Sequence, residues 1–279
     1  MLDFTKMNGA GNDFVMVDNR DRSLQLTPAR IAWLCDRHRG VGADGVLAVE
    51  PSRNGGDFRM RYYNSDGGEA EMCGNGARCF ARFVATLQGG SLDKVSFETI
   101  AGMIHATLEE SGDVCIDLGE PCDLALHTEL EIGGRPLHVH SVNTGVPHAV
   151  VVVDEVAEVD VAGAGAAIRR HPYFAPKGTN VNFMQVLAPG SLTIRTYERG
   201  VEAETLACGT GMVACAIIHH SLDAPPSPIR VKVLGGDVLR VGFDVSTDAG
   251  SAPARYSKVT LTGPADLVFH GAIRLPDHV

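Results

Sequence analysis

Two cysteines stand in nearly the same local sequence, and this repeat constrains the chain more than any other feature. Cys73 lies in EMCGNGARCF and Cys208 lies in TLACGTGMVA, so each is followed by Gly-x-Gly and by an apolar run that favours a helix. They are 135 residues apart in a chain of 279 residues. A cysteine loop duplicated at half the chain length predicts a duplicated domain, with one thiol from each half available to a shared site.

The repeat is longer than the cysteine loop itself. FRMRYYNSDGGEAEMCGNG and LTIRTYERGVEAETLACGTG both give an alternating strand, a tyrosine, a polar turn with Gly and Glu, and then the cysteine. Tyr63 precedes Cys73 by ten residues, and Tyr197 precedes Cys208 by eleven. The recurrence of this whole unit predicts two pseudo-symmetric α/β halves whose central helices begin at a common cleft.

The composition excludes several classes of partner and compartment. Lys and Arg number 24 against 34 Asp and Glu, and the net charge of −10 argues against nucleic acid or an anionic membrane as the main partner. The N-terminus has no signal core, and no stretch approaches the roughly 20 apolar residues of a spanning helix. The seven cysteines contain no CxxC pair, which fits neither a disulfide scaffold nor a zinc ribbon. We therefore expect a cytoplasmic protein with reduced thiols.

Strands dominate the expected secondary structure. Alternating or β-branched runs predict strands at 14–18, 58–63, 94–99, 137–142, 148–154, 192–198, 229–234, 258–263 and 267–275. The last of these has no obvious place in the second repeat, so we expect it to return to the first half. The first half then covers residues 1–122 together with 264–279, and the second covers 123–263.

Helices are expected in only four places. They are residues 27–39, the run from Cys73 to Gly89, the run from Cys208 to about Ser221, and the Gly- and Ala-rich segment VAGAGAAIRRHP. The segments 110–113 and 247–254 are typical of hairpin tips at the surface.

A cysteine at the N-terminus of a helix meets unsatisfied backbone N–H groups and the positive end of the helix dipole, and both favour the thiolate. Two such helix ends also suit a carboxylate. The pair can remove a proton from the carbon beside that carboxylate on one face and return one on the other, with one sulfur as base and one as acid. Backbone N–H groups would stabilise the developing charge at Gly74, Asn75, Gly209 and Thr210.

Other interpretations of the cysteines are less specific. A lone cysteine is most often a small buried apolar residue, and we expect this of Cys35, Cys79, Cys115, Cys122 and Cys215. Gly-x-Gly can also hold a phosphate, but the chain has neither GxxxxGK nor a strand followed by GxGxxG. A zinc site lacks two further ligands at a recognisable spacing. A redox disulfide between Cys73 and Cys208 remains the alternative from a different class.

Six segments, taken in order, resemble the signatures of diaminopimelate epimerase. They are KMNGAGNDFVMVD, DRHRGVGADGVL, RYYNSDGGEAEMCGNGARCFARF, NTGVPHAVV, KGTNVNFMQV and ERGVEAETLACGTGMVACA. The resemblance covers nearly the whole chain. It implies an α/β (α+β) fold of two pseudo-symmetric domains, each a mostly antiparallel curled sheet or barrel around a central helix. It also implies a cofactor-independent, two-base epimerase that interconverts LL- and meso-2,6-diaminopimelate.

The resemblance implies roles for individual residues. Cys73 and Cys208 correspond to the two bases. The ligands of the distal amino and carboxyl groups of the substrate correspond to Asn12, Asn64 and Asn180, which the residues alone would make turn positions.

Three further residues correspond to the family's residues beside the substrate and the thiols. Glu198 and Arg199 correspond to a pair that contacts the substrate, although the residues alone are equally consistent with a solvated ion pair. His148 and Glu198 correspond to groups that modulate the thiols. The chain departs from the common pattern at Gly45 and Val146, where many members have Gln and Asn.

The competing functions differ in their cysteine loops. Racemases of the same fold that act on proline or hydroxyproline usually contain CGHG and DRSPCGTG, whereas this chain has CGNG and ERGVEAETLACGTG. Phenazine-biosynthesis-like isomerases share the fold but lack the cysteine pair, and a thiol-redox or binding protein would use the site without turnover. The leading hypothesis is an isomerase acting on a small amino acid, with no metal or pyridoxal phosphate. By resemblance it is a homodimer.

Overall fold

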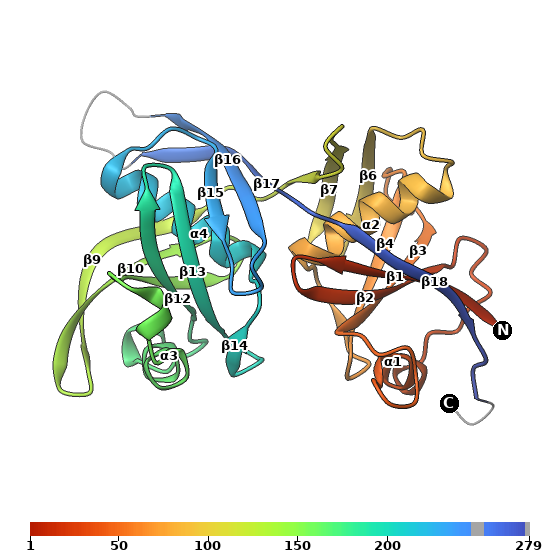
Figure 1. Cartoon of the computed structure of the whole chain (residues 1–279), viewed down its shortest axis with the longest axis horizontal. Helices are drawn as coiled ribbons and strands as arrows, with labels where there is room; N and C mark the ends of the chain where they lie inside the picture. The colour runs from red at the N-terminus through yellow and green to blue at the C-terminus, as the bar shows by residue number, and fades with distance from the viewer. Residues whose placement is uncertain (247–253, 277–279) are drawn as a thin grey trace. The chain divides into compact units, whose positions relative to one another are not determined.

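The computed structural model describes residues 1–246 and 254–276 and divides the chain into two compact units (Figure 1). Unit 1 comprises Met1–Asp117 and Gly263–Val279, and unit 2 comprises Leu118–Thr262. The sequence places the two boundaries at 122/123 and 263/264. Most of the expected hairpin tip at 247–254 lies outside the described residues.

Unit 1 is a mostly antiparallel sheet with two helices. Its hydrogen-bonded order is β18-β1-β2-β3-β4-β6-β7-β8, in which β2–β3 and β4–β6 are the parallel pairs and β5 adds to β4. The strands are β1 (Leu2–Gly9), β2 (Asn12–Asp18), β3 (Gly45–Pro51), β4 (Phe58–Asn64), β5 (Glu69–Ala70), β6 (Lys94–Thr99), β7 (Gly102–Leu108), β8 (Val114–Asp117) and β18 (Asp266–Ile273). The helices are α1 (Pro28–Cys35) and α2 (Gly74–Leu87).

Unit 2 repeats this order strand for strand. Its sheet runs β9-β10-β11-β12-β13-β15-β16-β17, with β11–β12 and β13–β15 parallel and β14 added to β13. The strands are β9 (Cys122–Ile132), β10 (Arg135–Asn143), β11 (Pro147–Val152), β12 (Asn180–Ala188), β13 (Ser191–Glu198), β14 (Ala203–Thr205), β15 (Ile229–Lys232), β16 (Val238–Ser246) and β17 (Arg255–Gly263). The helices are α3 (Val161–Arg169), α4 (Gly209–Asp223) and the 3₁₀ turns η1 (Val156–Glu158) and η2 (Pro172–Phe174).

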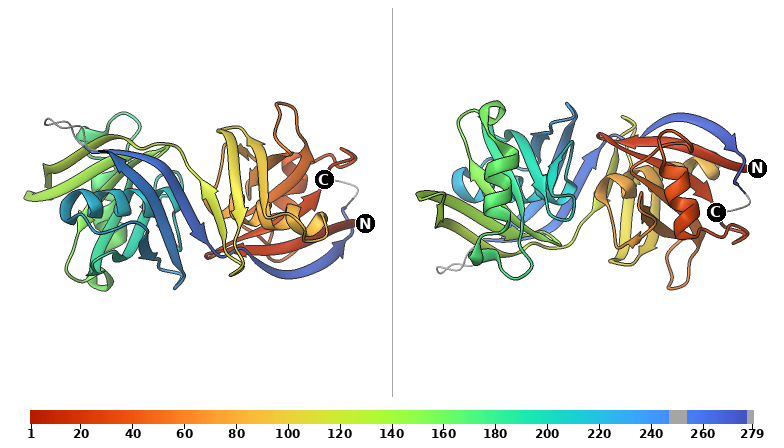
Figure 2. Two further views of the ribbon diagram at one scale, coloured as in Figure 1. Left: turned by 90° about the horizontal axis from the view of Figure 1, so that it is seen from above. Right: turned by 90° about the horizontal axis from the view of Figure 1, so that it is seen from below.

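Each unit encloses one long helix. The helix α2 packs against six strands of unit 1 (β1, β2, β3, β4, β7 and β8), and α4 packs against six strands of unit 2 (β10, β11, β12, β13, β15 and β16); Figure 2 shows each unit from two further sides. A helix inside a sheet must be apolar all round. Accordingly, α4 is buried without interruption from Gly211 to His219. The expected mixed α/β fold of two similar units, each curled around a central helix, is confirmed.

Strand register makes the two units comparable residue by residue. Phe14 pairs with Gly45 in the parallel β2–β3 pair, and His148 pairs with Asn180 in the parallel β11–β12 pair. Counting two residues further along β3 and β12 equates Leu47 with Asn182. The tyrosines of the sequence repeat agree with this register, because Tyr63 pairs with Val46 and Tyr197 pairs with Val181.

The first helix is shorter than its predicted range of 27–39. Thr27 caps it as expected, accepting the N–H of Arg30, but the helix ends at Cys35. The carboxylate of Asp36 accepts the backbone N–H groups of His38 and Arg39 at 2.8 and 2.9 Å. This local turn competes with the helical hydrogen bonds and stops the helix four residues early.

The expectation of burial is wrong for two of the five other cysteines. Cys35, Cys79 and Cys215 are buried, but Cys115 is only partly buried and Cys122 is exposed. Cys122 begins β9, whose first two residues face solvent. The last strand, β18, pairs antiparallel with β1 from Leu2 to Asn8, which is the return to the first half that its sequence suggests. No helix among residues 1–246 and 254–276 is long and apolar enough to cross a membrane.

Candidate active site

Cys73 is the N-cap of α2. Its backbone is extended (φ −136°, ψ 123°), and its Sγ accepts the backbone N–H of Gly76 at 3.5 Å. A side-chain acceptor at this position satisfies one of the helix's orphan donors, and the dipole of the 14-residue helix adds positive potential at the sulfur. The thiol is half-buried, so it sits at the open end of a buried helix.

A directed hydrogen-bond chain runs beneath Cys73. The guanidinium of Arg78 donates to Asn75 Oδ1 (2.9 Å), Asn75 Nδ2 donates to Asn12 Oδ1 (2.6 Å), and Asn12 Nδ2 donates to Asp44 Oδ2 (3.1 Å). Arg78 is fully buried and also donates to the carbonyl of Gly74 at 3.3 Å. Each amide therefore has its oxygen occupied by a neighbour, and each keeps one amide hydrogen for another acceptor.

The floor under the first turn of α2 is apolar. A Cβ built on Gly76 would lie 3.2 Å from Leu47 Cδ1 and 3.5 Å from Phe14 Cζ. Both side chains are fully buried. The glycine therefore lets two apolar side chains from β2 and β3 pack directly against the helix end.

Asn64 ends β4 opposite Gly45 and is exposed. Its backbone closes a turn, since its N–H donates to Gly68 and its carbonyl accepts from Gly67, both at 2.9 Å. A side chain at Gly45 is not possible without movement, because its Cβ would lie 2.5 Å from the carbonyl oxygen of Tyr63. The close approach of β4 thus leaves no room for a side chain at Gly45 in this arrangement.

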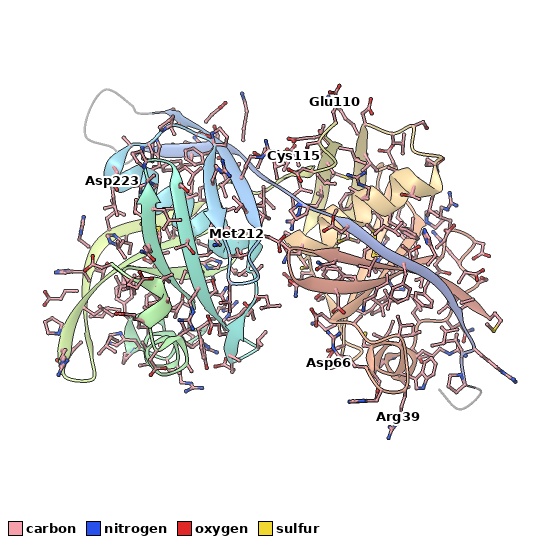
Figure 3. The ribbon with its side chains drawn as sticks, in the orientation of Figure 1. Arg39, Asp66, Glu110, Cys115, Met212 and Asp223 are labelled. Carbon is pink, nitrogen blue, oxygen red and sulfur yellow. The ribbon has the colours of Figure 1, made fainter. Side chains whose placement is uncertain are left out.

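Cys208 is the N-cap of α4. Its backbone is extended (φ −126°, ψ 110°), and its carbonyl accepts the first helical hydrogen bond from Met212 at 3.0 Å (Met212 is labelled in Figure 3). The residue is only 6% exposed. Its Sγ lies 3.6 Å from Thr210 Oγ1. In this half a hydroxyl group occupies the position beside the sulfur.

The hydroxyl of Thr210 continues into the core of unit 2. His148 Nε2 lies 2.9 Å from Thr210 Oγ1, and Asn182 Nδ2 lies 3.1 Å from His148 Nδ1. Asn182 Nδ2 also donates to the carbonyl of Ala149 at 3.1 Å. His148 and Asn182 have no exposed surface. Together these contacts link Cys208 at the helix end to a buried amide on β12.

His148 is a buried imidazole with a strongly lowered pKa. Burial lowers its pKa to about 3, and the nearby charge of Arg199 acts in the same direction. A neutral imidazole has one donor and one acceptor nitrogen, so its hydrogen-bond partners decide which nitrogen carries the proton.

The turn after β13 brings three of the expected residues together. Asn180 begins β12 and Glu198 ends β13, next to the Val181–Tyr197 pair, and Asn180 Oδ1 accepts the backbone N–H of Arg199 at 2.8 Å. Burial raises the pKa of Glu198, and the neighbouring Thr205 hydroxyl acts in the opposite direction. Arg199 also donates to the carbonyl of Lys177 at 3.4 Å. Asn180 is therefore a structural clamp for this turn, with its amide nitrogen still able to donate.

Each unit gathers its own set of predicted residues. Unit 1 links Cys73, Gly74, Asn75 and Asn12 around the start of α2, and Asn64 lies at the end of β4. Unit 2 links Cys208, Gly209, Thr210 and His148 around the start of α4, and Asn180, Glu198 and Arg199 share the turn after β13.

The residues that support these two sets through hydrogen bonds were not predicted from the sequence. They are Arg78, Asp44, Asn182, Thr196 and Thr144, whose hydroxyl donates to the carbonyl of Thr210 at 2.9 Å. Only Asn182 carried a signal, because a polar residue between the apolar positions Val181 and Phe183 of a buried parallel strand requires a partner. Within the part of the chain that the structure describes, no group of three or more His, Cys, Asp or Glu side chains is arranged to hold a metal ion.

Comparison with a family model and with known sequences identifies one family. The family model described as diaminopimelate epimerase matches residues 4–122 and 140–252. The diaminopimelate epimerase of Cupriavidus taiwanensis is 43% identical, with 98% of each chain covered. That of Aquifex aeolicus is 42% identical with the same coverage.

Solved structures share the fold at low sequence identity. A hydroxyproline epimerase from Agrobacterium vitis superposes with a TM-score of 0.67 at 18% identity, covering 97% of this chain and 91% of that one. A PhzF-family phenazine biosynthesis protein from Bacillus anthracis superposes with a TM-score of 0.69 at 15% identity, covering 98% and 99%. These two likenesses establish the architecture of the two units.

Proposed function

The chain belongs to the diaminopimelate epimerase family, and from this premise we propose that it interconverts LL- and meso-2,6-diaminopimelate. The protein is thus an isomerase of lysine and peptidoglycan precursor biosynthesis. The observation that carries the mechanism is the repeated cysteine, which caps the central helix of both units.

The two cysteines act as a base and an acid on opposite faces of one carbon. One thiolate takes the α-proton, and the electron pair left behind is held as an enolate on the adjacent carboxylate. The other thiol gives its proton to the opposite face, which inverts the centre and exchanges the protonation states of the two sulfurs. The N–H groups at the first turns, from Gly74, Asn75, Gly209 and Thr210, stabilise the enolate charge.

The distal end of the substrate is bound by amide and guanidinium donors. The oxygens of Asn12 and Asn180 already accept hydrogen bonds from Asn75 and Arg199. Each amide also keeps at least one N–H to donate, which suits a carboxylate. Arg199 adds a positive charge, and the exposed Asn64 adds an amide that is free to face either a carboxylate or an ammonium group.

We expect His148 and Glu198 to influence the ionisation of the thiols. A neutral imidazole adds no charge beside Cys208, so it supports the sulfur through hydrogen bonding alone. A carboxyl group with a raised pKa is more often protonated, which reduces its repulsion of a nearby thiolate.

Isotope exchange tests the proposed function. The protein is incubated with LL-diaminopimelate in D₂O with a reductant, and with proline and trans-4-hydroxyproline in parallel. We expect α-deuterium to enter diaminopimelate alone, with formation of the meso isomer, and added chelator to have no effect. Exchange into proline or hydroxyproline would favour the racemase alternative, and no exchange into any substrate would favour a redox or binding role.

We also propose that the protein is a homodimer of the cytoplasm. Three consecutive apolar residues of β18, Leu267, Val268 and Phe269, are 44%, 54% and 45% exposed. The pairing with β1 is irregular here, because Lys6 pairs with Phe269 and Met7 with Leu267, which leaves Val268 unpaired. The three side chains form a contiguous apolar patch of the kind that marks a protein interface. Light scattering after gel filtration should give a dimer mass for the native chain and a monomer mass for Phe269→Lys. A native monomer at micromolar concentration would contradict the proposal.

A further inference from the structure

The buried chain behind Cys208 has only one consistent direction. Asn182 Nδ2 faces the carbonyl of Ala149, which can only accept, so the amide nitrogen must be on that side. The Asn182 Oδ1 on the other side lies 2.9 Å from the hydroxyl of Thr196, which donates to it. The orientation of this amide is thus determined by its neighbours.

The direction of the amide sets the tautomer of His148. The second hydrogen on Asn182 Nδ2 points at His148 Nδ1, 3.1 Å away, so Nδ1 must be the acceptor nitrogen. Because the ring is neutral, the proton is on Nε2 and is donated to Thr210 Oγ1 at 2.9 Å. The oxygen of Thr210 therefore already accepts one hydrogen bond, and its own hydrogen is left to point at Cys208 Sγ, 3.6 Å away.

This polar chain is not required by the fold. At the equivalent positions of unit 1, Phe14 and Leu47 pack under Gly76 with an apolar floor. In unit 2, a Cβ built on Gly211 would lie 2.4 Å from Asn182 Oδ1, so the glycine makes room for the amide. A fully buried amide and imidazole are more costly to place than apolar side chains, which points to a role in the chemistry of the nearby sulfur.

We propose that Asn182 and Thr210 are positioning residues: through His148, Asn182 orients the Thr210 hydroxyl so that its hydrogen points at Cys208 and holds that sulfur ready to act as a base. The inference rests on the proposed two-base function and makes it more specific. It assigns the hydroxyl of Thr210 a task separate from that of its backbone N–H group. It also gives Cys208 a side-chain O–H donor.

The test measures the ionisation of Cys208 directly and without substrate. The full-length protein is labelled with [3-¹³C]cysteine, the Cys208 signal is assigned with Cys208→Ser, and its shift is followed against pH under reducing conditions. In Thr210→Val we expect the pH at which Cys208 is half ionised, its midpoint, to rise by about one to two units, because a hydrogen bond to a charged acceptor is lost. The midpoint of Cys73, in the other unit, should not move and serves as the control.

Two further variants separate positioning from simple structural damage. Thr210→Ser keeps the hydroxyl and should restore the Cys208 midpoint to within about 0.3 units of the native value. Asn182→Leu leaves Thr210 in place but frees the imidazole to adopt either tautomer, and should raise the midpoint by about half a unit. A Cys208 midpoint unchanged in Thr210→Val, or raised equally in Thr210→Ser, would overturn the inference. Failure of deuterium exchange in the native protein would overturn the proposed function and leave this titration unaffected.

Discussion

The two cysteine loops have similar backbones, but the strands under their first helical turns carry different side chains. In unit 1 a fully buried charge, Arg78, lies in the helix five residues after Cys73, and the floor of Phe14 and Leu47 is apolar. In unit 2 the corresponding helix residue is the buried Val213, and the polar groups are in the floor. The duplicated fold fixes where each sulfur lies, and the residues that differ between the halves decide how each sulfur is supported.

This difference fits a reaction in which the two cysteines start in different protonation states. A symmetric pair of thiols would ionise alike, whereas a two-base mechanism needs one thiolate and one thiol at the start. In unit 1 the sulfur accepts a backbone N–H from Gly76, and in unit 2 a hydroxyl from Thr210 lies beside it.

The largest expected effect comes from the sulfurs themselves. Cys73→Ser and Cys208→Ser should each lower epimerisation by about 10²- to 10⁴-fold, because a hydroxyl is a much poorer base than a thiolate. The two variants should differ in one respect: each keeps a single base and therefore exchanges the α-proton of only one isomer. Mass spectrometry of LL- and meso-diaminopimelate after incubation in D₂O measures this. Exchange of the same isomer by both variants would show that the cysteines do not act on opposite faces.

Removal of the buried charge should affect unit 1 alone. Arg78→Met leaves the carbonyls of Gly74 and Pro264 and the side chain of Asn75 without their donor. We expect the free energy of local unfolding to fall by about 3 kcal/mol. Hydrogen exchange of the amides of α2 measures the loss, and the amides of α4 are the internal control. Arg78→Lys keeps the charge but not the fork of donors. Protection of its α2 amides should therefore lie between that of the native chain and that of Arg78→Met. Equal protection of α2 in Arg78→Met and the native chain would contradict this role.

The sequence predicted the repeat because strand alternation and the Cys-Gly-x-Gly loops are local patterns. The helices after Cys73 and Cys208 and the strand at 94–99 agree with the structure almost to the residue. Nine of the eighteen strands in the described residues, β3 and β12 among them, were not predicted as strands. β3 is a nearly continuous buried run without the alternation that identifies a half-exposed strand.

The supports of the sites could not be predicted, because they depend on register between distant strands. His148 meets Asn182 only because β11 and β12 pair in parallel with His148 beside Asn180. Asp44 meets Asn12 only because β2 and β3 pair in the same way in unit 1. A single sequence contains the partners but not the pairing that brings them together.

Making unit 2 resemble unit 1 should separate stability from chemistry. His148→Phe and Asn182→Leu each leave a buried partner unsatisfied, and each should lower the local stability of α4 by about 2 kcal/mol. The double variant gives unit 2 an apolar floor like that of Phe14 and Leu47 in unit 1. Its loss of stability should therefore be smaller than the sum of the two single-variant losses by at least about 1 kcal/mol. Hydrogen exchange of α4 measures the three losses. Strictly additive losses would show that the two side chains do not act as a unit.

Acid should also distinguish the halves. Burial lowers the pKa of His148 to about 3 and that of His140, also in unit 2, to about 4. For both, the unfolded chain has the higher pKa, about 6.5, and binds more protons between these values. Their contribution is therefore complete above pH 6.5 and is lost as the pH falls towards the folded-state values. In unit 1, the hydroxyl of Ser52 and backbone N–H groups hold the pKa of Glu98 at about 2, so that contribution is lost only below about pH 4.5.

The smallest predicted effect is the loss of stability in unit 2 on mild acidification. Between pH 7.5 and 5.5, His148 alone should cost the native chain about 1.4 kcal/mol of unit 2 stability, since one pKa unit corresponds to about 1.4 kcal/mol. The double variant His148→Phe with Asn182→Leu lacks this group but keeps His140, so the difference between the two proteins isolates His148. Exchange of α4 amides, corrected for the intrinsic rate at each pH, should show the gap between native and variant narrowing by that amount, while α2 stays unchanged. A constant gap would mean that the imidazole takes up its proton over the same pH range in the folded and the unfolded protein, so that the chain from Asn182 to Cys208 does not hold it neutral.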